Sequence, residues 1–171
     1  MRLITRLSKT RVRERMERRV EAAAYHQQEV HARSLEMPMY EFREVDDAKD
    51  AHYAILSHRW NSIDEEITFD DIRLSRPLHS KPKGLKKLEY LLDQANKDGL
   101  TYVWIDTCCI DKSSSAELSE AINSMYYWYQ TARKCYAFLW DISAECPRLR
   151  DGLEGPWLES FARSEWFSRG W

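Results

Sequence analysis

The sequence predicts an α/β domain built on a parallel sheet flanked by helices, and two observations carry this prediction. Segments with strand and helix patterns alternate along the chain from residue 52 onwards. Residues 102–136 also read as strand, helix and strand within about 40 residues, which suits a right-handed parallel crossover. Such alternation is typical of a doubly wound sheet.

The first 50 residues are predicted to form a basic helical extension and a connector. Residues 1–34 contain no Gly or Pro, which favours a helix. Its scattered apolar positions are Leu3, Leu7, Val12, Met16 and Val20. Residues 1–20 carry eight Lys or Arg against two Glu, so this arm has a net charge of +6 and the remaining chain one of −8.

The basic arm admits several roles. Contact with nucleic acid or anionic lipid is one, and a mitochondrial address is another. We favour a solvated helix, because Glu14 and Glu17 interrupt the basic run and no aromatic residue lies among the arginines to stack on bases. Nucleic-acid binding is therefore not expected.

The first predicted strand and helix of the sheet follow this arm. Pro38 ends the helix, and residues 46–50 form a charged connector to a strand at 52–57. Residues 75–84 are rich in Pro, Ser and Lys, which predicts a surface excursion. The next helix has an apolar stripe formed by Leu85, Leu88, Leu91, Leu92 and Ala95. Gly99 is a suitable C-terminal stop for it.

The second half contains the clearest crossover. Residues 102–105 form an unbroken run of β-favouring residues, as expected of a strand buried on both faces. Ser114 and Glu117 fit a capping box at the start of the next helix. Residues 135–140 predict another buried strand. Residues 156–171 are aromatic and helix-forming, and we expect the domain to continue beyond them.

Composition narrows the classes of protein. A chain of 171 residues with 43% apolar residues is long enough for one globular domain. It has no run of 18 apolar residues, so we expect no membrane span, and it lacks the apolar core of a secretory signal. Five of the seven tryptophans follow residue 127, which predicts that the C-terminal half is the better packed one.

The cysteines and histidines indicate neither disulfides nor a metal site. Cys108, Cys109, Cys135 and Cys146 have no ligand spacing, and the five histidines are scattered. Reduced cysteines favour an intracellular compartment, with buried apolar roles for Cys109 and Cys135. No metal is expected.

Polar residues follow each predicted strand of the parallel sheet. Because the carboxyl ends of parallel strands share one edge, we expect these residues to form a ligand site there. The candidates are Ser57, His58, Arg59, Asp106, Trp140 and Asp141. The set suits a phosphate-bearing or ribose-bearing ligand, with Arg59 holding the anion.

Other interpretations of the same residues stay open. Asp106 and Asp141 could each only cap a loop, and His58 could be a half-buried structural histidine. The glycine-rich phosphate motifs are absent. A nucleophilic triad of Ser57 or Cys108 with His58 and Asp106 lacks the motifs that usually accompany one.

Three blocks of the chain resemble the fungal heterokaryon incompatibility domain, the HET domain. They are YAILSHRW at 53–60, the block at 99–136, and EWFSRGW at 165–171. The resemblance covers residues 53–171, so we divide the chain into the extension and connector at 1–50 and a partial HET domain at 51–171. HET domains are similar to TIR domains, which implies a TIR- and flavodoxin-like sheet.

The resemblance implies an effector of fungal non-self recognition that triggers programmed cell death in the cytoplasm. It implies self-association through the loop at 106–115 and contact with other death-signalling proteins or domains. The self-association candidates are Thr107, Asp111, Lys112, Ser114 and Glu117. The alternative is a TIR-like NAD hydrolase, but its expected glutamate has no counterpart before Trp171. NAD as a substrate aside, no cofactor is expected.

Overall fold

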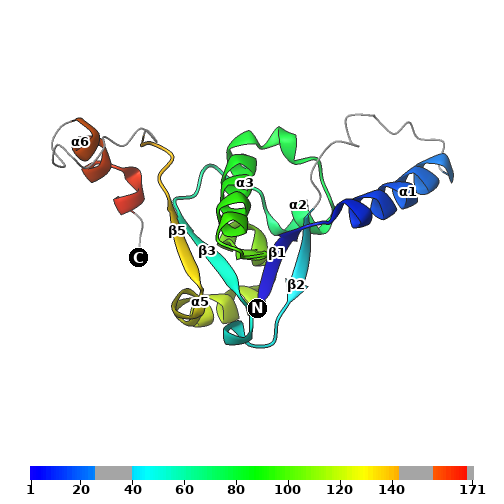
Figure 1. Cartoon of the computed structure of the whole chain (residues 1–171), viewed down its shortest axis with the longest axis horizontal. Helices are drawn as coiled ribbons and strands as arrows, with labels where there is room; N and C mark the ends of the chain where they lie inside the picture. Colours follow the sequence, from blue (N-terminus) through cyan, green and yellow to red (C-terminus); the bar gives the residue numbers. More distant parts are fainter. Residues whose placement is uncertain (26–39, 143–155, 169–171) are drawn as a thin grey trace.

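A computed structural model describes residues 1–25, 40–142 and 156–168 of the chain (Figure 1). The strands are β1 (Arg2–Arg6), β2 (Tyr40–Glu44), β3 (Tyr53–His58), β4 (Tyr102–Trp104) and β5 (Lys134–Phe138). The helices are α1 (Lys9–Tyr25), α2 (Phe69–Arg73), α3 (Pro82–Lys97), α4 (Asp106–Cys109), α5 (Ser115–Thr131) and α6 (Pro156–Ala162). Short 3-10 turns lie at η2 (Ala48–Asp50), η3 (Leu78–Ser80) and η5 (Glu165–Ser168).

The fold is an open α/β sheet flanked by helices, as predicted. Its strand order is β2-β1-β4-β3-β5. β3 pairs in parallel with both β4 and β5, whereas β1 is antiparallel to both β2 and β4. β3 therefore lies inside the sheet, and all six of its residues are buried. The chain moves from β3 to one side and then crosses to the other, so the topological switch lies between β3 and β5.

Helices cover the two faces of β3. Lys87 of α3 contacts His58, while the hydroxyl of Tyr53 donates to the carbonyl of Trp128 on α5. His58 and Tyr53 are five positions apart in one strand, so their side chains point to opposite faces of the sheet. α3 and α5 therefore pack on opposite faces, as expected when one right-handed crossover runs from β3 to β4 and the next runs in the opposite direction from β4 to β5.

The first residues form a strand where the sequence predicted a helix. Leu3 and Ile4 of β1 are fully buried between β2 and β4. The guanidinium of Arg2 lies 2.7 Å from carboxylates of both Glu44 and Glu117. The helix prediction is wrong for residues 2–6 and confirmed by α1 for 9–25, and the rest of the predicted helix lies outside the described residues. The domain boundary at residue 50 stays a prediction, although β1 and β2 belong to the same sheet as β3.

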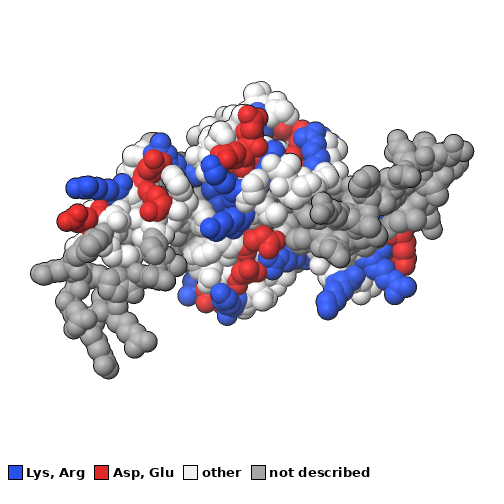
Figure 2. Space-filling view, turned by 90° about the horizontal axis from the view of Figure 1, so that it is seen from above, with Lys and Arg blue, Asp and Glu red and all other residues white. Residues whose placement is uncertain are grey.

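α1 extends away from the sheet, and basic side chains gather at that end of the molecule (Figures 1 and 2). Arg11 nevertheless pairs with Glu41, and Arg13 with Glu17. Arg15 donates to the carbonyl of Tyr40 at 3.3 Å. Several arginines of this end thus form ion pairs or hydrogen bonds within the chain.

The start of α5 at Ser114 forms only one of the two hydrogen bonds of the expected capping box. The Ser114 hydroxyl accepts from the Glu117 amide at 3.3 Å, as predicted. The Glu117 carboxylate turns instead to the Asp111 amide, 2.7 Å away, and to Arg2. A distant arginine thus redirects the carboxylate away from the amide that the local pattern assigned to it.

The C-terminal half is less buried than predicted. β5 is an edge strand with no buried residue, so Cys135 is exposed rather than apolar core. Trp140 is 57% exposed. Among the described residues after Ile110, the buried ones are Ala121, Met125 and Ser164. The prediction of a better packed C-terminal half is wrong, because the core forms where β3 and β4 lie between helices.

Candidate functional site

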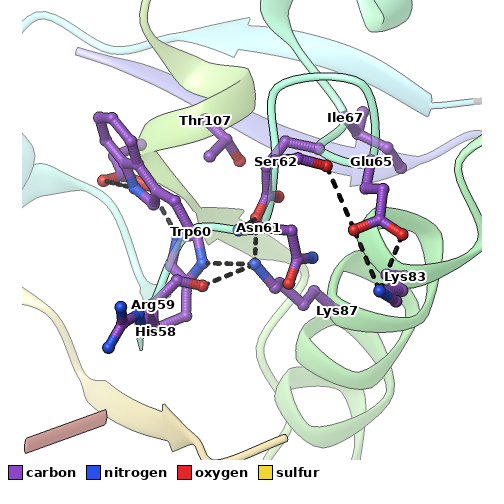
Figure 3. A network of polar contacts seen from close by, with 12 residues as sticks. His58, Arg59, Trp60, Asn61, Ser62, Glu65, Ile67, Lys83, Lys87 and Thr107 are labelled. Carbon is purple, nitrogen blue, oxygen red and sulfur yellow. Dashed lines mark hydrogen bonds and ion pairs between the residues drawn. The ribbon is translucent and has the colours of Figure 1, made fainter. Parts of the chain in front are cut away.

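A buried chain of polar side chains begins at the end of β3 (Figure 3). His58 Nε2 lies 2.7 Å from a carboxylate oxygen of Asp106, the first residue of α4. Lys87 of α3 lies 3.1 Å from His58 Nδ1 and 2.8 Å from the carbonyl oxygen of Arg59. Its ammonium also pairs with Glu66, and all four side chains of this chain are buried.

The N–H groups of Lys87 determine which nitrogen of His58 accepts a hydrogen bond and which one donates. An ammonium can only donate, so His58 Nδ1 presents its lone pair to Lys87 and the ring proton lies on Nε2, facing Asp106. Lys87 thereby uses all three of its N–H groups. Both nitrogens of His58 are occupied, and its side chain is 1% exposed. His58 is therefore a positioning residue here and has no nitrogen directed at a ligand.

Burial and charge act against each other in this chain. Burial raises the pKa of Asp106, but hydrogen bonds from His58 and Trp60 outweigh it, and the pKa lies below the ordinary aspartate value. Burial lowers the pKa of Lys87, and the neighbouring Glu66 only partly offsets this. The network thus favours the carboxylate form of Asp106, whereas at Lys87 burial opposes the positive charge that Glu66 stabilises.

Asp106 also orients the aromatic residue at the mouth of the site. Its second carboxylate oxygen accepts from the Trp60 indole at 2.8 Å. Trp60 is 55% exposed, and the Lys112 ammonium lies 3.7 Å from the centre of its ring. A cation at that distance is attracted by the ring face. Asp106 therefore positions an indole and, through it, a lysine.

A cavity of about 520 Å³ opens beside these residues at the carboxyl edge of the sheet. Its polar side chains include Arg59, Lys112 and Ser168, and Ile122 and Met125 of α5 contribute to its apolar wall. A neighbouring cavity of about 460 Å³ shares that wall and is bounded by Trp166 and Phe167. We call the first of these two cavities the cleft. It lies near the topological switch, where open α/β sheets bind ligands.

The structure places five of the six predicted ligand residues in two groups and leaves Trp140 apart from both. His58 and Asp106 belong to the buried network. Ser57, Arg59 and Asp141 contact the segment 164–168 instead, through the Ser57 carbonyl and the side chains of the other two. Trp140 follows β5 but lines neither cavity. A ligand-binding role for these residues stays a prediction.

The predicted self-association residues have different exposures. Thr107 is buried, so it reaches no surface unless the loop opens. The carboxylate of Asp111 accepts from Ser113 in a local turn, while Ser114 and Glu117 hold the start of α5. Lys112 is exposed. Lys112 is therefore the member of this set best placed to meet a partner.

A thiol nucleophile is disfavoured by the structure. Cys108 is fully buried, donates to the Ile67 carbonyl at 3.2 Å, and has a pKa raised by burial to about 12. The described residues contain no group of three potential metal-ligating side chains. No described helix has the length and apolar character needed to cross a membrane.

Sequence reasoning missed Glu66 and Lys87. Lys87 lies three residues after Gly84 and four before Leu91, so it falls within the buried face of α3. A lysine on this otherwise apolar face was the available sign of a buried charge. Glu66 gave none, because the loop that carries it has no periodicity.

The fold and the cleft define an α/β domain with a candidate ligand site at the edge of its parallel strands. The heterokaryon incompatibility protein (HET) family model matches residues 53–151. The chain is also 46% identical over 119 residues to the vegetative incompatibility protein HET-E-1 of Podospora anserina. The chain therefore belongs to the HET family.

The two chains differ greatly in length. The match covers 70% of this chain but 8% of HET-E-1. No solved structure matches the chain significantly.

Proposed function

We propose that this chain is a HET effector module of fungal non-self recognition that promotes programmed cell death by assembling with copies of itself. Membership of the HET family carries this proposal. The name of HET-E-1 states vegetative incompatibility, and the match of the HET family model at residues 53–151 includes the unit from β3 to β5. We further propose that the protein acts in the cytoplasm, consistent with the free thiols of Cys108 and Cys109.

The proposed assembly surface is the loop at 106–115 together with the outer face of α5. Ile122 and Tyr126, one helical turn apart on α5, are 61% and 79% exposed. Lys112 lies on the loop before this helix and is exposed as well. Exposed apolar side chains beside a charged loop suit a protein contact. Other death-signalling proteins or domains would bind at the same surface.

Light scattering over a concentration series tests the assembly. We expect the average mass of the wild-type chain to rise with concentration and that of Lys112→Glu and Ile122→Glu to stay monomeric. Lys86→Glu, an exposed charge reversal on α3, is the matched control and should assemble like wild type. A monomeric wild type at all concentrations would contradict self-assembly.

Cell death is tested separately, by inducible expression in a filamentous fungus. Vital-dye uptake should rise with the wild-type chain and with Lys86→Glu, and rise much less with Ile122→Glu. Equal killing by all variants would separate cell death from this surface. A fluorescent fusion located outside the cytoplasm would contradict the proposed compartment.

The cleft supports a second candidate, hydrolysis of NAD. Its volume of about 520 Å³, the exposed Trp60 indole and the cations Arg59 and Lys112 suit a ligand with rings and phosphates. Incubation with NAD, followed by measurement of nicotinamide, tests this candidate. Release that disappears in Arg59→Gln would support it, and no release above buffer would count against hydrolysis by this chain.

A further inference from the structure

The segment 164–168 is attached at three points to the edge of the sheet that forms the cleft. The indole of Trp166 donates to the Ser57 carbonyl at 3.1 Å. Asp141 accepts from the Ser164 hydroxyl and the Glu165 amide, both at 2.8 Å. Arg59 makes the third attachment. The segment therefore connects the ends of β3 and β5 across the topological switch.

The third attachment occupies the guanidinium of the cleft. Arg59 lies 3.6 Å from the Glu165 carboxylate and donates to the Glu165 carbonyl at 3.3 Å. It also donates to the Ser168 hydroxyl. The same guanidinium is the anion-binding group that the sequence predicted. Oxygen atoms of Glu165 and Ser168 therefore occupy the position beside Arg59 that an external anion would take.

The charges around the cavity favour an anion once Glu165 is displaced. Both oxygens of Asp106 are already used, by His58 and Trp60. The cations Arg59 and Lys112 remain among the described lining residues. Arginine binds phosphate-type oxyanions through paired N–H groups, which makes such an anion a direct competitor of Glu165.

The attachment is weak enough to be exchanged. The side chains of Arg59 and Glu165 are 43% and 52% exposed, and no residue of η5 is buried. Exposed ion pairs contribute little to stability, and segments with few buried contacts open first. The turn η5 can therefore open readily, whereas the side chains of the adjacent His58 network are buried.

We propose that the turn η5 is a latch on the cleft, in which Glu165 and Ser168 hold Arg59 and a phosphate-type oxyanion entering the cleft releases them. This latch goes beyond the proposed assembly and does not depend on it. Binding of the oxyanion and release of Glu165 and Ser168 from Arg59 are the same event, because one guanidinium serves both. The segment 164–168 then keeps its attachments through Trp166 and Asp141. The cleft and the C-terminal segment are therefore coupled.

Calorimetric titration of the full chain with inorganic pyrophosphate tests the latch. Glu165→Gln should bind pyrophosphate about two- to fivefold more tightly than wild type, the range expected for loss of an exposed competing ion pair. Glu159→Gln removes the same charge from exposed α6 and should bind like wild type. Arg59→Gln should lose most of the binding.

Hydrogen exchange provides the second measurement. Pyrophosphate should speed amide exchange in residues 164–168 of the wild type, and Glu165→Gln should show fast exchange there without pyrophosphate. Absence of pyrophosphate binding, equal affinity in wild type and Glu165→Gln, or unchanged exchange would each overturn the latch. Self-association is measured separately by light scattering, so a failed assembly and a failed latch give different results.

Discussion

His58 and Arg59 are neighbours in sequence at the end of β3, yet they belong to opposite kinds of structure. His58 is 4% exposed and joins a buried network in which every polar contact is direct. Arg59 has a side chain that is 43% exposed and holds a peripheral turn. Burial decides the difference, because removing one partner strands a charge in the first case and lets water replace it in the second.

The comparison separates what supports the cleft from what can respond to a ligand. The buried network joins β3, α3, the first residue of α4 and the loop that carries Glu66, so it sets the shape of the cleft. The exposed contacts of Arg59 determine whether its guanidinium is available. A substitution in the network should therefore alter the free energy of unfolding. A substitution in the latch should alter how tightly an anion binds at Arg59.

Lys87→Met should have the largest effect. It leaves the Glu66 carboxylate buried without its cation, and breaking a buried pair in this way typically lowers the free energy of unfolding by about 3–5 kcal/mol. Chemical denaturation measures the change. The exposed neighbour Lys86→Met is the control and should change stability by less than about 0.5 kcal/mol.

The double variant Lys87→Met with Glu66→Gln sharpens this prediction. It removes the buried Glu66 charge that Lys87→Met leaves unpaired. The double variant should therefore recover part of the lost free energy of unfolding, because the effects of residues in direct contact are not additive. A loss in Lys87→Met no greater than that in Lys86→Met would show that the network does not support the fold.

Asp106→Asn should lower the free energy of unfolding by about 2–3 kcal/mol, because an amide cannot accept from both His58 and Trp60 as the carboxylate does. The folded pKa of Asp106 is depressed, so its contribution is present above the unfolded pKa and lost as pH falls through the folded value. Wild-type stability should therefore fall below about pH 4, and part of that fall should be absent in the variant. An identical pH dependence in both proteins would contradict the assigned pKa direction.

Gly84→Ala tests the close packing that holds the loop carrying Glu66. A Cβ at residue 84 would lie 2.6 Å from the Glu65 carbonyl oxygen and 2.7 Å from the Ile67 nitrogen. Overpacking of this kind typically lowers stability by about 1–3 kcal/mol. Lys83→Ala removes an exposed ion pair to the same loop and should lower it by less than about 1 kcal/mol. Equal losses would mean that the close contact relaxes freely.

Glu165→Gln should have the smallest effect on stability, within about 0.5 kcal/mol of wild type, because its ion pair is exposed. Thermal unfolding checks this expectation. A large loss would show that the turn is part of the core structure, which would weaken the contrast between the two neighbouring residues.

The sequence by itself determined the unit from β3 to β5. The apolar run of β3, the stripe of α3 with its stop at Gly99, and the start of α5 at Ser114 are local patterns, and each reports the face that an element buries. The same order also indicated that Ser57, His58, Arg59 and Asp106 meet at one edge. Family membership followed from these segments.

Only the tertiary structure decided the elements whose partners are distant in sequence. Arg2 and Arg6 begin and end β1, beside its buried Leu3 and Ile4, because carboxylates from elsewhere in the fold neutralise them. Lys87 is buried because Glu66 and His58 face it, and Arg59 is occupied because Glu165 approaches it. A local pattern records which residues are apolar, but the free energy of a charge depends on its surroundings, and those are set only when distant segments pack together.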